Sequence, residues 1–248
     1  MLTAIILTLN EERHVTACIE SLRWADKTIV FDSNSQDATV DLAHEAGAIV
    51  IQHTFENYSA QRNAALDAAE GADWVFFVDA DERATPALAQ EIQKITAQEG
   101  PEAGWWVARH NYIFGHRMRA TGWWPDHQLR LLRCSQARYD PNRAVHEVAV
   151  LDGPAGYLEN PLIHYNYETL AQFRAKQQRY TDYDAGILQE KGIRPKVYTP
   201  YTQLFRHFWW RFITLKGWRD GIYGMLLSSL MAYYEMIKYQ KLARLVRT

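Results

Sequence analysis

The chain has 248 residues and a hydrophobic content of 48%, enough for one large domain or for one domain with an appendage. Its only cysteines are Cys18 and Cys134, and their wide separation argues against a disulfide framework or a cysteine-based zinc site. The chain opens on an apolar, strand-like segment and shows no signal-peptide pattern, so we expect a cytoplasmic location.

Charge is divided unevenly along the chain. Residues 201–248 contain eight Lys or Arg and two acidic residues, a net charge of +6, which leaves −8 for residues 1–200. An acidic globular part followed by a basic and aromatic tail indicates a partner with a charged surface. Nucleic acid is not the expected partner, because the main part is acidic and no RNA-binding motif accompanies the aromatics.

The first hundred residues predict repeated strand–helix units. Short apolar strands are expected at residues 3–8, 28–31, 48–51 and 74–79. The intervening helices are expected from Asn10 to about Trp24, from residues 35–37 to Gly47, and over residues 59–70, and another begins at Thr85-Pro86. Asn10 is the predicted N-cap of the first helix. The alternation predicts an α/β fold with a parallel, doubly wound sheet.

The pattern changes after Gly100-Pro101. Further strands are expected at residues 105–109, 128–133, 145–150 and 162–164, followed by a polar helix at 169–191, a linker at 192–200 and helices at 201–216 and 221–244. We therefore expect an α/β domain over residues 1–165, with halves 1–100 and 101–165, and a helical region over residues 166–248.

Acidic residues follow two of the predicted strands. Asp32 ends the second strand, and Asp79 and Asp81 stand one residue apart at the end of the fourth. The carboxyl ends of parallel strands share one crevice, and two hard oxygen ligands there suit Mg²⁺ or Mn²⁺ with a diphosphate. The alternatives are a turn role for Asp32 and helix capping for the other two, although Thr85 already supplies that cap.

Four segments occur in an order that resembles family 2 glycosyltransferases. They are residues 8–12 (TLNEE), 31–37 (FDSNSQD), 61–63 (QRN) and 79–82 (DADE). The likeness covers about residues 2–165 and implies the GT-A fold, a Rossmann-like and mostly parallel sheet with a mixed acceptor-side part, here with a C-terminal helical appendage. Residues 130–133, 145–147 and 163–165 are similar to enzymes that build the lipopolysaccharide inner core, glucosyltransferases above all.

This resemblance implies a nucleotide-sugar site in residues 1–100. Its members would contact the base, ribose or diphosphate of a UDP-sugar, and they are Thr8, Leu9, Asn10, Glu11, Asp32, Arg62, Asn63, Asp79 and Ala80. Asp32 would accept a hydrogen bond from the uracil ring. The turn after it has Asn34 where many relatives have glycine, and Asn can adopt the left-handed conformation that such a turn needs.

The resemblance also implies an Mn²⁺ or Mg²⁺ ion and a catalytic base. Asp81 would bind the metal directly, Asp79 could share it, and His146 could complete the shell or remain a strand histidine. An inverting displacement needs a base to take the proton of the acceptor hydroxyl. Asp126 is the first candidate, with a solvated turn residue as the alternative, and Glu147 is the second.

Tryptophan pairs occur twice in the acceptor-side half. Trp123 and Trp124 precede the candidate base, and we expect them to stack on an acceptor saccharide, with core filling as the alternative. Trp105 and Trp106 lie within a predicted strand, and we expect them to fill the core.

The tail has apolar residues at helical spacing. Phe205, Phe208, Trp209, Phe212 and Leu215 would form one face, with Arg206, His207, Arg211 and Thr214 opposite. The longest uncharged run, residues 221–234, is shorter than the ~20 residues of a membrane span. We expect an interfacial helix pair on an anionic membrane; the alternative is packing against the main domain or a second subunit.

Together these features predict a metal-dependent, inverting hexosyltransferase. It would move glucose from UDP-glucose to a lipid-linked saccharide, such as the lipopolysaccharide inner core, on the inner face of the cell membrane. The alternatives are a sugar transferase acting on polyprenyl phosphate and a non-catalytic nucleotide-sugar-binding module. The oligomeric state is not predicted by the sequence.

Overall fold

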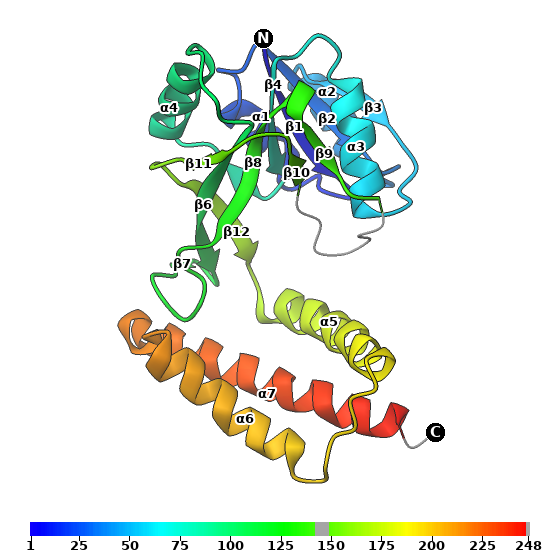
Figure 1. The fold of residues 1–248 in the computed structure, drawn as a ribbon, viewed down its shortest axis with the longest axis vertical. Coiled ribbons are helices and arrows are strands. Elements are labelled where there is room, and N and C mark those ends of the chain that lie inside the picture. The colour runs from blue at the N-terminus through cyan, green and yellow to red at the C-terminus, as the bar shows by residue number, and fades with distance from the viewer. Residues whose placement is uncertain (142–148, 247–248) are drawn as a thin grey trace. The chain divides into compact units, whose positions relative to one another are not determined.

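The computed structural model describes residues 1–141 and 149–246. The chain forms two compact units (Figure 1). The sheet unit contains Met1–Arg109 and His127–His164, and the helical unit contains His110–Asp126 and Tyr165–Thr248. Residues 110–126, assigned above to the acceptor-side half of the α/β domain, therefore group with the C-terminal helices.

The sheet unit is built on four parallel strands in the order β3-β2-β1-β4. These are β1 (Leu2–Thr8), β2 (Lys27–Asp32), β3 (Ile49–Gln52) and β4 (Trp74–Asp79). Ile5 of β1 lies between Ile29 and Phe77 of its two neighbours. The predicted parallel α/β sheet is confirmed, and all four strands end close to where their apolar runs end.

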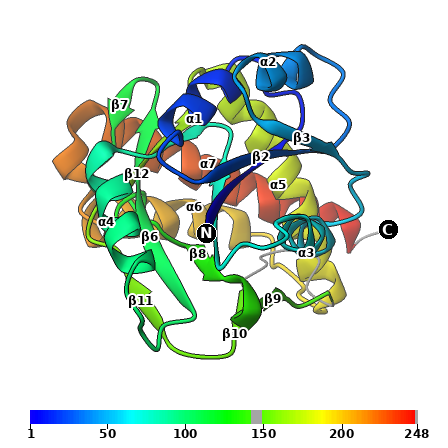
Figure 2. The ribbon, with the colours of Figure 1, turned by 90° about the horizontal axis from the view of Figure 1, so that it is seen from above.

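Helices cover both faces of this sheet because both faces of its strands are apolar. In β4, Phe76 and Val78 pack with α1 (Val15–Ser21), α2 (Thr39–Glu45) and α4 (Pro86–Thr96). The alternate residues Val75 and Phe77 pack with α3 (Tyr58–Ala68) on the other face. Figure 2 shows α1 and α2 on one side of β1–β3 and α3 on the other.

Mixed strands extend the sheet beyond β4. β8 (His127–Arg133) runs antiparallel to β4 and to β6 (Gly104–Ile113), and β11 (Ala155–Tyr157) pairs with β6. β12 (Leu162–Tyr167) pairs with the short β5 (Glu82–Arg83), which directly follows the acidic motif. After η1 (Cys134–Gln136), β9 (Ala137–Tyr139) and β10 (Ala149–Leu151) form a separate two-stranded sheet.

The first helix begins later than predicted. α1 starts at Val15, its N-cap position is His14, and Asn10 has a left-handed backbone with φ of 57°. An N-cap residue adopts an extended conformation instead, so the predicted capping role of Asn10 is wrong. Thr85, by contrast, does cap α4, because its side chain accepts a hydrogen bond from the Leu88 amide at 3.2 Å.

The helical unit contains three long helices. α5 (Leu170–Glu190) starts at a capping box formed by Thr169 and Gln172. α6 (Thr199–Trp209) continues into the π-helical turn η2 (Trp210–Thr214), and the short η3 (Gly217–Asp220) leads into α7 (Gly221–Leu245). α6 and α7 lie side by side and run in opposite directions (Figure 1).

A small apolar cluster holds this unit together. The hairpin of β6 with β7 (His116–Arg117) contributes Ile113, and Met118 follows it. These residues pack with Phe173 of α5 and with Leu227 and Tyr234 of α7. No helix in the described parts of the chain is long and apolar enough to cross a membrane.

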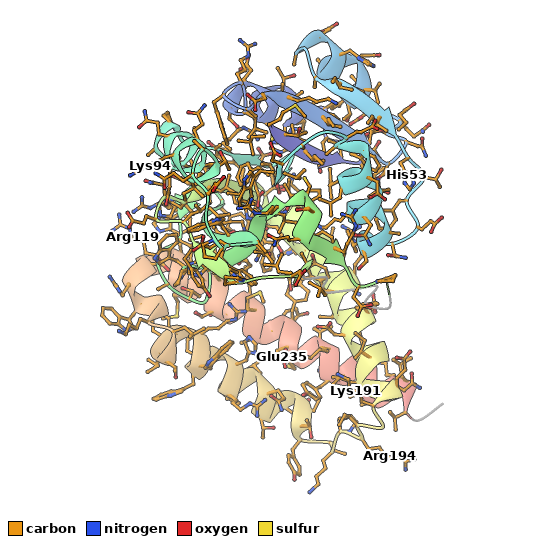
Figure 3. The ribbon with its side chains drawn as sticks, turned by 45° about the horizontal axis from the view of Figure 1, so that its top comes forward. His53, Lys94, Arg119, Lys191, Arg194 and Glu235 are labelled. Atoms are coloured by element: carbon orange, nitrogen blue, oxygen red, sulfur yellow. The ribbon has the colours of Figure 1, made fainter. Side chains whose placement is uncertain are left out.

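The basic side of the tail is only partly exposed: Arg206 and Thr214 are exposed, and His207 and Arg211 are not. Arg211 and His207 are partly buried: Arg211 donates to the Thr121 carbonyl at 2.8 Å and to Nε2 of His207 at 2.8 Å. His207 lies 3.8 Å from Glu235 of α7, which Figure 3 labels. Tyr201, Phe205, Trp209 and Ile213 form an exposed row along α6 and η2. Arg211 and His207 therefore bond within the helical unit, although the sequence placed them on the basic side expected to meet anionic lipid.

Candidate functional site

Asp32 ends β2 with its carboxylate fully buried. One oxygen accepts from the Thr8 hydroxyl at 2.8 Å and the Ser35 hydroxyl at 2.5 Å, and the other accepts from the Ser35 amide at 2.8 Å. The carboxylate thus holds the ends of β1 and β2 and the turn after β2 in one arrangement. The turn uses a left-handed Asn34 with φ of 62°, as expected. The uracil-binding role of Asp32 stays a prediction.

The loop after β1 is bound to the loop after β2 by reciprocal hydrogen bonds. The Asn10 amide donates to the Ser35 hydroxyl at 2.8 Å, and the Asn10 side chain accepts from the Gln36 amide at 2.8 Å. The Glu11 amide donates to the Thr39 hydroxyl at 2.7 Å. Leu9 remains 53% exposed beside these contacts. The predicted nucleotide-contacting residues of the two loops therefore form one fixed rim.

Asp79 is bound by a buried arginine that the sequence interpretation gave no role. Both terminal nitrogens of Arg130 on β8 donate to the Asp79 carboxylate, one at 3.1 Å, and Arg130 also bonds Glu82 at 2.9 Å. Glu82 is fully buried, accepts from the Asp79 amide at 2.9 Å, and pairs with Arg109 at 3.1 Å. The sequence did contain a sign of this role, because Arg130 is a charged residue in the otherwise apolar strand segment 129–132.

These arginines set the ionisation of Asp79. Burial by itself raises the pKa of this carboxyl group, but the charge of Arg130, followed by those of Arg62 and Arg109, outweighs burial and holds the pKa well below its usual range. Asp79 is therefore anionic at neutral pH. A metal at Asp79 would have to share a carboxylate that Arg130 already binds, so the geometry favours Asp81 as the direct ligand.

Asp81 faces a histidine from β12. Its carboxylate lies 3.3 Å from Nε2 of His164, which is 5% exposed. Adjacent ligands of an octahedral ion with bonds of about 2.1 Å lie about 3 Å apart, so this pair can serve as two ligands. The intervening Ala80 is buried, and its carbonyl accepts from Arg83 at 2.7 Å, which fixes the turn. In the sequence, His164 was included only in the segment 163–165 that resembles lipopolysaccharide inner-core enzymes, and it was given no role at the metal site.

A metal at this place would need further ligands. Over residues 1–141 and 149–246, no three His, Cys, Asp or Glu side chains come together as a metal site. Mg²⁺ and similar ions are commonly held by one or two protein ligands and completed by substrate phosphates and water. Asp81 and His164 fit that pattern. The predicted residues His146 and Glu147 lie outside the described residues.

Arg62 and Asn63 begin the second turn of α3. The Arg62 guanidinium lies 3.8 Å from the Asp79 carboxylate and 5.2 Å from the centre of the Phe77 ring. Asn63 exchanges two hydrogen bonds with the Tyr139 backbone, each of 2.9 Å, so it anchors β9 to α3. The structure thus places Arg62 beside the acidic motif and gives Asn63 a positioning role, while its contact with a nucleotide stays a prediction.

The two neighbouring tryptophans of β6 have different surroundings. Trp105 packs against the core and lies over Gly156, where an added Cβ would come within 2.3 Å of the indole. Trp106 instead lines a hollow with Arg62 and Arg130. The expectation of core filling is met by Trp105 and is wrong for Trp106.

Asp126 belongs to the helical unit and is held by an asparagine chain. Asn111 donates to the Asp126 carboxylate at 3.0 Å and to the Trp123 carbonyl at 2.9 Å, and Asn166 donates to Asn111 at 3.1 Å. Asn111 is fully buried, so these contacts orient the carboxylate. A positioned carboxylate suits a general base.

The tryptophans before Asp126 face different neighbours. Trp123 packs into the apolar cluster of the helical unit, with its ring centre 6.2 Å from that of Tyr167. The Trp124 ring lies 4.4 Å from that of His110. The acceptor-stacking role of both residues stays a prediction.

A family model described as glycosyl transferase family 2 matches residues 3–159. The lipopolysaccharide core biosynthesis glycosyltransferase LpsC of Rhizobium meliloti (strain 1021) is 30% identical over 97% of this chain and 91% of its own length. An uncharacterized glycosyltransferase of Rickettsia prowazekii (strain Madrid E), RP128, is 35% identical over 97% of this chain and 86% of its length.

Among solved structures, the glucosyl-3-phosphoglycerate synthase of Mycobacterium tuberculosis, in complex with Mn²⁺, UDP and glucosyl-3-phosphoglycerate, aligns with a TM-score of 0.47 and 18% identity. The alignment covers 79% of this chain and 81% of that one.

Proposed function

Because the chain belongs to glycosyl transferase family 2, we propose that it transfers a hexose, glucose from UDP-glucose, with inversion to a lipid-linked saccharide of the lipopolysaccharide inner-core type. The fold is of the GT-A type. The observation that carries the proposal is the acidic pair at the end of β4, where Asp81 faces His164 at 3.3 Å and Asp79 is held anionic by Arg130. The name of the LpsC relative supports the acceptor class.

The donor is proposed to bind at the carboxyl ends of β1, β2 and β4. Asp32, Thr8 and the rim of residues 9–11 would receive the base and ribose, and Arg62 would contact the base or the diphosphate. These groups are already fixed by hydrogen bonds between the loops, so little ordering is needed when a nucleotide binds.

The residues present fit an Mn²⁺ or Mg²⁺ ion. Asp81 and His164 would hold it, together with diphosphate oxygens of the donor. When bound, the ion would offset the negative charge that grows on the leaving diphosphate. Asp126, oriented by Asn111, would take the proton of the attacking acceptor hydroxyl, and Trp124 would support the acceptor ring.

A donor screen tests this proposal. Purified protein would be mixed with UDP-glucose, UDP-galactose or GDP-mannose, with Mn²⁺, Mg²⁺ or EDTA, and release of the nucleoside diphosphate measured. We expect metal-dependent release and a rise in melting temperature for the UDP-sugars, with UDP-glucose the best. Binding of a donor with no release or transfer in the presence of lipopolysaccharide-core acceptors would favour the non-catalytic alternative.

The helical unit is proposed to bind the inner face of the cell membrane. The exposed row on α6 and η2, named the α6 row, contains Tyr201, Phe205, Trp209 and Ile213 at four-residue spacing, with Phe205 72% and Trp209 64% exposed. Side chains at this spacing share one helix face. Trp218 and Ile222, 58% and 76% exposed, extend the apolar surface at the start of α7.

The charges around these residues favour an anionic surface. Between residues 191 and 226 the exposed charged residues are all basic: Lys191, Arg194, Lys196, Arg206, Lys216 and Arg219. Figure 3 labels Lys191 and Arg194, at the end of α5 and in the loop that follows. Asp220, the acidic residue of this range, is buried. Aromatic residues next to basic ones are typical of interfacial helices.

Liposome flotation tests the membrane proposal. Replacing Phe205 and Trp209 by Ser should lower binding to phosphatidylglycerol-containing vesicles about tenfold or more, because each buried large apolar side chain contributes about 1.5–3 kcal/mol. The matched control replaces Tyr180 and Tyr183, which are similarly exposed on α5, and should bind normally. If the Phe205/Trp209 variant floats like the wild type, the surface is not the membrane contact.

A further inference from the structure

A hollow in the sheet unit lies beside the acidic motif and shares only Arg62 with the residues proposed to bind the donor. Its lining includes Arg62 of α3, Arg130 and Gln128 of β8, Trp106 of β6 and Tyr139 of β9. Arg130 reaches Asp79 and Glu82 through its terminal nitrogens. Arg62 also lies 3.8 Å from the Asp79 carboxylate, so two arginines join the hollow to the end of β4.

The polar side of this hollow favours an anion. Arg130 is 3% exposed, and its Nε atom is buried without a hydrogen-bond partner among the described residues. An unsatisfied buried donor is costly and uncommon, and a ligand oxygen would satisfy it. Within the described part of the chain, the lining of the hollow contains two guanidinium groups and no carboxylate. Arginine presents several fixed N–H donors, which match the oxygens of a phosphate or carboxylate.

The apolar side of the hollow leads to an aromatic surface. The Trp106 ring stacks on Tyr157 of β11, with ring centres 6.4 Å apart and planes 19° apart, and His127 of β8 meets Tyr157 edge-on at 5.2 Å. Tyr157 is 62% exposed, although a large aromatic side chain gains more by burial. An exposed aromatic held rigidly by two others is a surface on which a sugar ring can stack.

We propose that Arg130, Trp106 and Tyr157 form an acceptor subsite for a saccharide that carries a phosphate or carboxylate group. The anion would bind Arg130, and the sugar ring would lie against Trp106 and Tyr157. This inference rests on the proposed glycosyltransfer and names the acceptor chemistry: a charged sugar is selected over a neutral one. Phosphate and carboxylate share the same recognition, so the probes below separate them.

Binding of simple sugars to the full chain tests the subsite independently of transfer. Glucose 6-phosphate, glucuronate and glucose would be titrated by NMR, with UDP and Mn²⁺ present so that the donor site is filled. We expect either charged sugar to bind about tenfold more tightly than glucose, as charge-assisted hydrogen bonds allow. The tighter of the two identifies the anion. Equal affinity for glucose and both charged sugars would overturn the proposal.

Two variants assign the binding to these residues. Arg130→Lys should weaken the charged sugars about tenfold and leave glucose unchanged, whereas Arg133→Lys is the matched control. Arg133 lies on the same strand but stacks on Trp74, 4.5 Å from its ring centre. Tyr157→Ala, at an exposed position that cannot unfold the core, should weaken all three sugars. Unchanged binding in the Tyr157 variant would contradict the subsite even if the Arg130 variant failed to fold.

Competition with UDP separates this proposal from a donor role. If glucose 6-phosphate and UDP bind together, the hollow is distinct from the diphosphate site, as proposed. If UDP displaces the charged sugar, the hollow receives the donor diphosphate and the acceptor subsite is wrong. Failure of the proposed function would appear differently: no donor would be turned over, while the sugar titrations would still give an answer.

Discussion

The sheet unit and the helical unit place their large aromatic side chains differently. In the sheet unit Phe31, Phe76 and Phe77 are fully buried between the sheet and its helices. In the helical unit Phe205 and Trp209 are 72% and 64% exposed, while the charged Asp220 is buried and Arg211 is partly buried. The sheet unit buries these phenylalanine rings, although Tyr58 and Tyr157 are 53% and 62% exposed. The helical unit leaves much of its apolar surface uncovered, as expected of a part that docks onto something apolar.

Both units bury charged side chains, but these side chains have different structural roles. In the sheet unit Arg130, Asp79 and Glu82 surround the candidate site and control its electrostatics. In the helical unit Asp220 accepts from the Arg119 and Ala120 amides and the Thr121 hydroxyl at 2.8–3.0 Å, which fixes a loop onto the start of α7. In the sheet unit, buried charge therefore lies at the candidate site, whereas in the helical unit it holds the backbone in place.

The largest expected effect tests the sheet unit. Asp81→Ala removes a proposed metal ligand and should lower transfer at least ~100-fold, because loss of charge stabilisation at the leaving group typically costs 10²–10³ in rate. Melting temperature should change little, since Asp81 is partly exposed. Asp67→Asn, at an exposed carboxylate of α3, is the control. Full activity of the Asp81 variant would sink the metal assignment.

Asp126→Asn asks whether the helical unit takes part in the chemistry. The amide keeps the shape of the carboxylate but cannot accept the proton, so turnover should fall about 100-fold with donor affinity nearly unchanged. Steady-state kinetics together with a UDP-glucose titration would measure both. If Glu147→Gln alone shows this behaviour, the base is misassigned and the helical unit only supports the acceptor.

Asp220→Ala tests the structural role of buried charge in the helical unit. It removes the acceptor of three hydrogen bonds, and loss of hydrogen bonds to a buried charged group should lower the free energy of unfolding by about 3 kcal/mol. Chemical denaturation followed by circular dichroism would measure the loss. Asp152→Ala, at an exposed position of the sheet unit, should have almost no effect. A small change for Asp220 would show that the loop is held by its packing instead.

The smallest expected effect is a difference in acid sensitivity. Burial, and then the charge of Arg211, lowers the pKa of His207 to about 4, whereas the unfolded value is about 6.5. The unfolded chain therefore takes up a proton first as the pH falls from about 6.5 to 4, and this costs up to about 1 kcal/mol of stability per pH unit. Asp79, whose pKa is lowered, contributes stability that persists until the pH falls below about 4.

Amide hydrogen exchange measures the acid sensitivity of each unit separately. Between pH 6.5 and 4.5, after correction for intrinsic rates, α6 and α7 should lose protection before β1 and β4. His207→Gln, which keeps a hydrogen-bond acceptor for Arg211 but does not titrate, should reduce the loss. Equal loss of protection in both units would contradict the inferred role of His207.

Much of the fold could be predicted because it depends on local patterns. The apolar run from Trp74 to Val78 and the Thr85-Pro86 cap act within a few residues, and β4 and α4 begin and end close to the expected positions. Asn10 was misread because its environment is not local: its side chain and amide bond a loop that lies about 25 residues further along the chain. The same polar residue types cap helices and hydrogen-bond to neighbouring loops, and the sequence alone does not distinguish these two roles.

The candidate site shows the same division. Asp32, Asp79 and Asp81 were found because parallel strands bring their carboxyl ends together. Arg130 and His164 were noted but had no role, because their partners are 48 to 83 residues away. Trp105 and Trp106 were both expected in the core because they lie within a predicted strand. Consecutive strand residues point to opposite faces, and only Trp105 packs against the core.

The sequence by itself determined the family, the parallel α/β sheet, and the place of the acidic motif at the end of a buried strand. These properties follow from residue order and from periodicity, which are fixed along the chain. Only the tertiary structure decided which carboxylate is held by an arginine and which faces a histidine, and which side of the tail faces outward. Those outcomes depend on contacts between segments that are distant in the sequence. Whether such a side chain is buried, paired with a charge or hydrogen-bonded depends on which groups the fold brings next to it.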